Sequence, residues 1–212
     1  TEYDEIMRRA FAEKHNCYYL SPFSSASYGY MTRFPIRSMA DLKGKKIRAA
    51  GNSSLVAQAQ GAVPAEIAPA EQYTALQRGT IDGIVYPFYT GVSYKFYEVV
   101  KYASWPPMYV VSAHHLLVNL DAWNSLPKEY QDILKEEAHK MEIRVYKEIG
   151  PALDKMAQEK GTADYGVENV WLSDEEFSKL GKATLPLWDK WAAQSDYSAK
   201  LVQICKKVAG IK

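Results

Sequence analysis

Short apolar segments alternate with short helical segments along residues 46–104, and this alternation limits the folds that the chain can adopt. Strands that alternate with helices form a parallel or mixed sheet that is covered by helices on both faces. Ligands of such sheets bind beyond the carboxyl ends of the strands. We therefore expect the fold class α/β with mixed sheets, with strands at 46–50, 63–68, 81–88 and 98–104 and helices at 52–60, 71–78 and 90–97.

A second pattern predicts one long helix from Ser125 to Lys160, because apolar residues keep helical spacing across it. A continuous helix of this length would span about 50 Å at roughly 1.5 Å per residue. Such a helix is longer than a small domain is wide, so we expect it to bridge two bodies. Gly150-Pro151 should bend it, because proline removes a backbone donor and clashes with the preceding turn. Gly161 is expected to end it.

The overall charge excludes partners that are recognised by a strong electrostatic field. The chain has 26 Lys and Arg against 25 Asp and Glu, a formal net charge of +1. This balance draws neither nucleic acid nor an anionic membrane surface, so any anion site must be local. Aromatic residues make up 13% of the chain, and sixteen of them are tyrosines. Packing in the core and on the surface explains most such rings, whereas rings that gather near strand ends would line a cleft, and both interpretations stay open.

Cysteine and histidine spacing favours neither a metal site nor a cofactor, and we expect none. Cys17 and Cys205 lie far apart in the chain, and whether they pair is open at this stage. His114 and His115 fall in a predicted strand at 107–120, so their rings should point to opposite faces. That geometry suits neither a shared metal ion nor a proton relay. His115 remains a candidate for a ring that contacts a ligand.

The chain lacks the common catalytic signatures, among them the nucleophile elbow, the zinc-protease helix, the phosphate loop and the dinucleotide fingerprint. We therefore expect that it is not an enzyme. Two alternatives stay open: a carboxylate-processing enzyme that uses His115 or Cys17, and a ligand-sensing module that signals to a partner protein.

Arg48 is the strongest candidate for binding a ligand. In KKIRAAG, Ile47 and Ala49 should face the core, which turns Arg48 to the other side of the strand. A guanidinium group there matches a carboxylate with two parallel hydrogen bonds. The N-terminus of the helix at 53–60 would add backbone N–H groups nearby. Tyr86 stands where another predicted strand ends, just before a proline, which is a frequent position for a residue of a ligand cleft.

Four segments carry a family resemblance: PIRSMADLKGKKIRAAG (35–51), GAVPAEIAPAEQYTALQRGTIDGIVYP (61–87), VVKYAS (99–104) and LLVNLDAWNSLPKEYQDIL (116–134). They resemble the substrate-binding receptors of tripartite ATP-independent periplasmic (TRAP) transporters, the dicarboxylate-receptor family. The resemblance implies a periplasmic, two-lobed α/β protein that closes around a small organic carboxylate ligand. It also implies that the membrane permease subunits of a TRAP transporter are its partners, with no nucleic acid involved.

The resemblance also implies roles for individual residues. An arginine at the position of Arg48 grips the ligand carboxylate, and the position of Tyr86, often Asn in the family, also touches the ligand. Phe88 and Tyr89 would extend that wall, and Arg33 would be a second basic residue of the site. Tyrosine in place of asparagine makes the wall larger and more aromatic. It therefore favours an aromatic or bulky apolar monocarboxylate.

The same resemblance implies a division of the chain into four parts: a connecting helix (1–16), the second lobe (17–112), a strand returning to the first lobe with the long bridging helix (113–172), and C-terminal helices (173–212). It implies a first lobe that is incomplete in this chain. A dimer or a swapped assembly is one way to cover its exposed core surface. The chain opens on a charged helix, so we expect the signal peptide to have been removed or the chain to be an internal piece.

Overall fold

The computed structural model describes residues 1–23, 26–109 and 114–211. Its contacts divide the chain into two compact units. Unit 1 comprises Thr1–Ser24, Ala113–Lys147 and Pro186–Lys212, and unit 2 comprises Ser25–Ser112 and Glu148–Leu185. Within the described residues, no helix has both the length and the apolar character that crossing a membrane requires. The four-part division expected from the sequence stays a prediction.

Unit 2 is built on a six-stranded mixed sheet. β3 runs parallel to β4 and β5, whereas β2 runs antiparallel to β5 and β6, and β6 runs parallel to β8. The mixed sheet predicted from the strand–helix alternation is therefore confirmed. In spatial order the strands are β4 (Val63–Ala65), β3 (Lys46–Arg48), β5 (Gly83–Pro87), β2 (Tyr28–Thr32), β6 (Tyr102–Trp105) and β8 (Glu168–Trp171).

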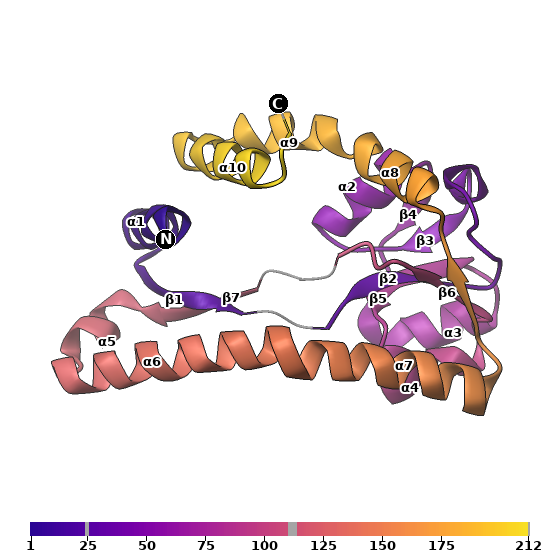
Figure 1. The fold of residues 1–212 in the computed structure, drawn as a ribbon, viewed down its shortest axis with the longest axis horizontal. Helices are drawn as coiled ribbons and strands as arrows, with labels where there is room; N and C mark the ends of the chain where they lie inside the picture. Colours follow the sequence, from indigo (N-terminus) through magenta and orange to yellow (C-terminus); the bar gives the residue numbers. More distant parts are fainter. Residues whose placement is uncertain (24–25, 110–113, 212) are drawn as a thin grey trace. The chain divides into compact units, whose positions relative to one another are not determined.

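Helices cover both faces of this sheet, as Figure 1 shows. On one face lie α2 (Asn52–Ala59) and α8 (Asp174–Ala183), and on the other lie α3 (Gln72–Gln77), α4 (Thr90–Ser93) and α7 (Gly150–Tyr165). Single turns of 3-10 helix, η1 (Met39–Leu42), η2 (Pro69–Glu71) and η3 (Phe96–Glu98), complete the connections. The helix expected at 90–97 is split into α4 and η3, because Lys95 between them adopts a left-handed conformation with φ of 60°.

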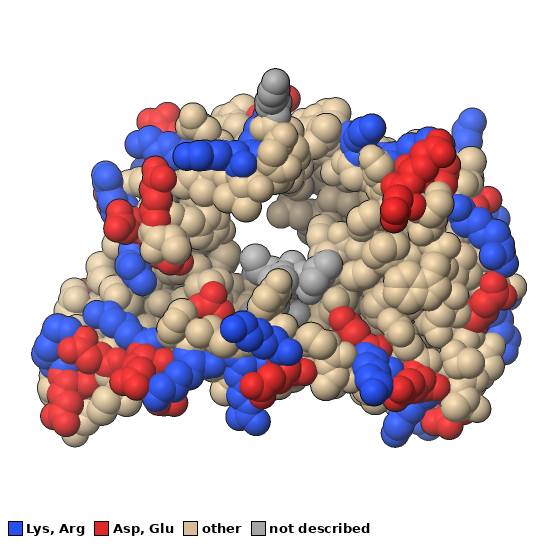
Figure 2. Space-filling model, viewed as in Figure 1, with Lys and Arg blue, Asp and Glu red and all other residues tan. Residues whose placement is uncertain are grey.

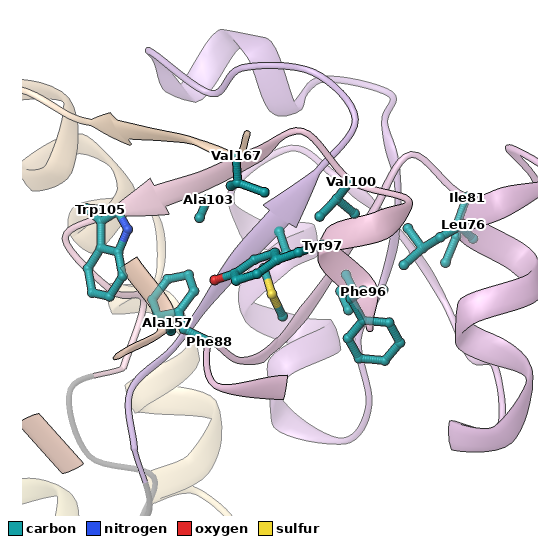
Figure 3. Close-up of a cluster of buried hydrophobic side chains, with 12 residues drawn as sticks. Leu76, Ile81, Phe88, Phe96, Tyr97, Val100, Ala103, Trp105, Ala157 and Val167 are labelled. Atoms are coloured by element: carbon teal, nitrogen blue, oxygen red, sulfur yellow. The ribbon is translucent and has the colours of Figure 1, made fainter. Parts of the chain in front are cut away.

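The larger of two core clusters lies between the sheet and α3, α4 and α7 (Figure 3). Phe88 is 0% exposed and its ring stacks on Trp105 with a centroid distance of 4.1 Å. This packing requires glycine at position 29 of β2, because a Cβ there would lie 2.1 Å from Phe88 Cζ. Ile47 and Ala49 belong to the second cluster, on the opposite face of the sheet with α2 and α8. The inward direction predicted for both side chains is confirmed.

Unit 1 contains the antiparallel pair β1 (Cys17–Phe23) and β7 (His114–Asn119). Both α1 (Glu2–His15) and α6 (Lys128–Arg144) pack against β1. The remaining helices are α5 (Leu120–Ser125), α9 (Leu185–Ala192) and α10 (Asp196–Val208), of which α10 packs beside α1. β7 covers the end of the strand predicted at 107–120, of which residues 110–113 lie outside the described residues.

The long helix predicted from Ser125 to Lys160 is present, but its predicted start is wrong: Ser125 ends α5, and the long helix begins at Lys128 after Pro127. α6 and α7 are joined by a π-helical segment, η4 (Val145–Ile149), directly before Gly150-Pro151. Proline has no backbone N–H to donate to the preceding turn, and the π turn is a local change in the helical hydrogen-bond pattern at that place. The bend predicted at Gly150-Pro151 stays a prediction. The predicted end at Gly161 is wrong, because the helix continues to Tyr165. Gly161 instead allows a close contact, since a Cβ there would lie 2.9 Å from Tyr97 Cε2.

The surface of α6 carries both signs of charge. Lys140 pairs with Glu136 and with Glu137, each at 2.8 Å, one turn apart on the same helix. Figure 2 shows acidic and basic side chains interspersed along this helix rather than gathered by sign. This surface agrees with a chain whose net charge is close to zero.

Candidate functional site

β3 and β5 place Arg48 and Tyr86 on the same face of the unit 2 sheet. The two strands are parallel, with Arg48 opposite Ile84, so Tyr86 follows two residues nearer to the carboxyl ends of the strands. The Arg48 guanidinium carbon lies 5.2 Å from the centroid of the Tyr86 ring. A guanidinium within about 6 Å of a ring face is attracted by the ring quadrupole. The site is therefore a charged group held against an aromatic wall, at the end of the sheet where ligands bind.

Arg48 is buried, and none of the described carboxylates forms an ion pair with it. The residue is 7% exposed, and its Nε donates a hydrogen bond of 3.1 Å to the Ile67 carbonyl. Among the residues that the structure describes, the ion pairs include none that involves Arg48. Burial lowers the pKa of its guanidinium, and Tyr86, Glu66 and Tyr28 oppose that shift. Glu66 thus acts on the guanidinium electrostatically, but none of the described carboxylates forms an ion-pair contact with it. A buried arginine without such a contact is costly, and an anionic ligand would reduce that cost.

Gln72 at the start of α3 contacts the guanidinium group from within the protein. It is 0% exposed. With its amide oxygen toward Arg48, that oxygen lies 2.9 Å from Nε, 3.2 Å from Nη1 and 3.1 Å from Nη2. An atom at nearly equal distance from all three nitrogens must lie over the guanidinium plane rather than within it. The in-plane N–H groups of Nη1 and Nη2 are therefore left for another acceptor, and they form the fork that a carboxylate matches.

Further rings surround Tyr86. Its centroid lies 6.3 Å from that of Tyr28, 6.2 Å from that of Tyr94 and 6.1 Å from that of Phe96. Tyr89 precedes α4 and belongs to the same neighbourhood: burial raises the pKa of its hydroxyl, and Tyr28, Tyr94 and Tyr86 add to that shift. The structure thus brings Arg48 and Tyr86 into contact, and Tyr89 lies within electrostatic range of Tyr86.

The other three predicted residues lie elsewhere. Phe88 is fully buried in the larger core cluster, so its ring packs inside unit 2 and cannot contact a ligand. Arg33 is exposed and follows β2, where its backbone N–H donates to the Asp82 carbonyl at 2.9 Å. Because β2 and β5 are antiparallel, this position is at the opposite end of β5 from Tyr86. The structure therefore does not bring Arg33 to the Arg48 site.

His115 lies in unit 1, on β7. Its ring is exposed and lies 5.6 Å from that of Phe11 and 5.5 Å from that of Tyr19, measured between centroids. It belongs to a different unit from Arg48, so its part in the site stays a prediction. Cys17 and Cys205 are both free thiols. The described residues contain no group of three or more His, Cys, Asp or Glu that could hold a metal ion.

Gln72 and Tyr28 are site residues that the sequence analysis missed. A signal for Gln72 existed, because it opens the helix that follows the next strand after Arg48. Residues at helix starts beyond parallel strands lie at the ligand-binding edge of such sheets. Tyr28 had no local signal, since it reaches the site only through the antiparallel pairing of β2 with β5.

Comparison with solved structures identifies the fold as that of TRAP periplasmic solute-binding proteins. A protein of this class from Marinobacter aquaeolei matches with a TM-score of 0.85 and 20% identity, covering 95% of this chain and 67% of that one. The ectoine-binding protein of the TRAP transporter of Halomonas elongata matches with a TM-score of 0.82 and 23% identity, covering 95% of this chain and 66% of the other. The predicted fold class is confirmed.

Residues 2–195 match the family model "Bacterial extracellular solute-binding protein, family 7", and the chain belongs to this family. The resemblance predicted from the four segments is thus confirmed. A monocarboxylate 2-oxoacid-binding periplasmic protein of Nostoc sp. is 36% identical over 121 residues, which are 53% of this chain and 31% of that protein. The 2,3-diketo-L-gulonate-binding periplasmic protein of Escherichia coli is 33% identical over 146 residues, which are 66% of this chain and 42% of that protein. The chain spans less than half the length of these two relatives.

Proposed function

We propose that the chain is the solute-binding receptor of a TRAP transporter, which binds a small organic acid in the periplasm and delivers it to the membrane permease subunits. The observation that carries this proposal is the buried Arg48, which faces Tyr86 and lacks a carboxylate partner among the described residues. The named relatives support it, because they are periplasmic proteins that bind 2-oxoacids and diketogulonate.

The mechanism follows from the chemistry of the fork. A ligand carboxylate accepts hydrogen bonds from Nη1 and Nη2, in the plane that the amide of Gln72 leaves free. Hydrogen bonds to charged groups contribute about 1.5–3 kcal/mol each. The ligand also supplies a carboxylate in direct contact with Arg48, which the described residues do not provide. Closure of lobes around a ligand, a known type of domain motion, would then exclude water from this contact.

The decisive experiment is calorimetry of a panel of carboxylic acids with the purified full-length protein and two arginine variants. We expect Arg48→Ala to lower the affinity for the best acid of the panel by at least about tenfold, because it removes charge-assisted hydrogen bonds. Arg33→Ala is the matched control, since Arg33 is an exposed arginine at the other end of the sheet. Unchanged affinity in Arg48→Ala, with both variants folded, would overturn the proposal.

The relatives named above are binding proteins, and we propose that this chain likewise catalyses no reaction. No specific observation favours the enzyme or the sensing module considered from the sequence. The comparisons do not support a dimer or a swapped assembly, and neither is part of the proposal.

A further inference from the structure

A hollow in the surface of unit 2 lies next to the Arg48 site. It has a volume of about 400 Å³ and is lined by Pro69, Ala70, Tyr73, Tyr94 and Phe96. None of these five lining residues is charged. We call it the aromatic hollow. Its composition, apolar and rich in rings, is typical of sites that hold the non-polar part of a small ligand.

Two connections join the aromatic hollow to Arg48. The first is the short segment 67–73, in which Ile67 and Gln72 contact the guanidinium group while Pro69, Ala70 and Tyr73 line the hollow. The second is Tyr86, whose ring contacts the guanidinium group and also neighbours the rings of Tyr94 and Phe96. The charged site and the hollow are therefore neighbours, joined by segment 67–73 and by the ring of Tyr86.

The rings of the hollow are held in place. Phe96 is 1% exposed and belongs to the core, so it forms a fixed floor. The Tyr73 hydroxyl donates to Glu98 Oε2 at 2.7 Å, which occupies its polar tip and leaves its ring face for an apolar group. Tyr94 is 53% exposed and packs edge-on against Phe96 at a centroid distance of 5.8 Å. Fixed rings bind a planar apolar group at a low cost in conformational entropy.

We infer that the aromatic hollow is a subsite for the ring of an aryl-substituted monocarboxylic acid whose carboxylate is held by Arg48. This inference rests on the proposed function. A polyhydroxylated sugar acid fits poorly, because hydroxyl groups that lose water against apolar rings without new partners are costly. The selectivity of the receptor then comes from the rings, whereas Arg48 binds any carboxylate.

The test compares two acids that differ only in the ring, 3-phenylpropanoate and propanoate, by calorimetry of the full-length protein. We expect the wild type to bind 3-phenylpropanoate more tightly. Aromatic contacts contribute about 0.5–1.5 kcal/mol beyond area burial. Tyr94→Ala removes this contribution together with the buried contact area, so it should weaken 3-phenylpropanoate by at least about twofold and leave propanoate unchanged. Tyr130→Ala is the matched control, since Tyr130 is 55% exposed on α6 of unit 1, and it should change neither affinity.

The outcomes separate this inference from the proposed function. If Arg48→Ala weakens both acids but the wild type does not favour the aryl acid, or Tyr94→Ala weakens both acids equally, the subsite is overturned and the receptor function stands. If Arg48→Ala leaves both affinities unchanged, the proposed function fails, and the inference fails with it. If the wild type binds neither acid, the aryl monocarboxylate is overturned as the ligand class.

Discussion

The side-chain amide of Gln72 lies over the face of the Arg48 guanidinium group, and with its oxygen toward Arg48 that oxygen is 2.9–3.2 Å from the three nitrogens. A neutral amide in this place stabilises the charged group without neutralising it. The fork of Arg48 therefore keeps its full charge for a ligand. A carboxylate at position 72 would instead neutralise the guanidinium group and occupy its hydrogen-bond donors.

We expect Gln72→Glu to lower the affinity for carboxylic acids by at least about tenfold, because an internal carboxylate then pairs with Arg48 and competes with the ligand. The same variant should unfold at a higher temperature than the wild type, since the buried cation gains a partner. Calorimetry and thermal unfolding measure the two effects. Wild-type affinity in Gln72→Glu would show that Arg48 does not bind the ligand carboxylate.

Tyr86 allows its ring and its hydroxyl to be tested separately. Tyr86→Phe keeps the ring against the guanidinium group and removes only the hydroxyl. We therefore expect the binding free energy to weaken by no more than about 1.5 kcal/mol, the upper contribution of one hydrogen bond. Tyr86→Leu also removes the cation–π contact and should weaken binding further. Calorimetry with one acid ranks the three proteins. Equal affinity in Tyr86→Leu and the wild type would exclude this ring from the site.

Gly29 and Phe88 offer a prediction about stability. Gly29→Ala places a methyl group into the Phe88 ring, and overpacking of a core costs about 1–3 kcal/mol. The double variant Gly29→Ala, Phe88→Leu should recover part of that loss, because the two residues are in contact. Denaturant unfolding gives these free energies. As a control, Gly181→Ala lies on α8 with open space around its Cβ and should be neutral or stabilising. Additive effects of the Gly29 and Phe88 changes would contradict the predicted contact.

Asp154 on α7 makes the stability of unit 2 depend on pH. Burial raises the pKa of its carboxyl group, although hydrogen bonds from Ser27 act in the other direction. A carboxyl whose pKa is raised by folding binds its proton more tightly in the folded state, so its ionisation destabilises the fold above that pKa. We expect Asp154→Asn to be more stable than the wild type at neutral pH, with a difference that shrinks as the pH falls through the raised pKa.

Thermal unfolding of both proteins across a pH series measures this dependence. The asparagine keeps an oxygen that can accept from the Ser27 backbone N–H, which lies 3.2 Å from Oδ1 in the wild type. A stability difference that grows toward acidic pH would contradict the sign of the shift.

Local patterns predicted β3, β4, β5 and β6 and the direction of Arg48, because alternation along a strand depends only on neighbouring residues, but they did not predict β8. The same patterns did not predict that Arg48 is buried. Its burial depends on α3, which covers the face of the sheet opposite Ile47 and Ala49. Arg33 was assigned to the site from its position near the family motif. The antiparallel pairing of β2 with β5 places it at the far end instead, and that pairing is a property of topology rather than of local sequence.

Phe88 and Gly161 show the same limit. Phe88 stands two residues after Tyr86 in the sequence, but the chain leaves the strand after Pro87, and the ring turns into the core. Gly161 resembles a helix stop, yet its role is to admit the ring of Tyr97. Both outcomes depend on partners far away along the chain, which no pattern within one segment reveals.

Because the segment 67–73 both contacts the guanidinium group and borders the aromatic hollow, a substitution there would change two properties at once. A substitution that widens the hollow at Tyr73 would also disturb the neighbouring Gln72. The orientation of the Arg48 guanidinium group, which is proposed to bind the ligand carboxylate, would then change as well. Tyr94 lies outside this segment, on the connection between α4 and η3. In the proposed receptor, a substitution at Tyr94 should therefore change which acid is preferred without changing the contacts of Ile67 and Gln72 with Arg48.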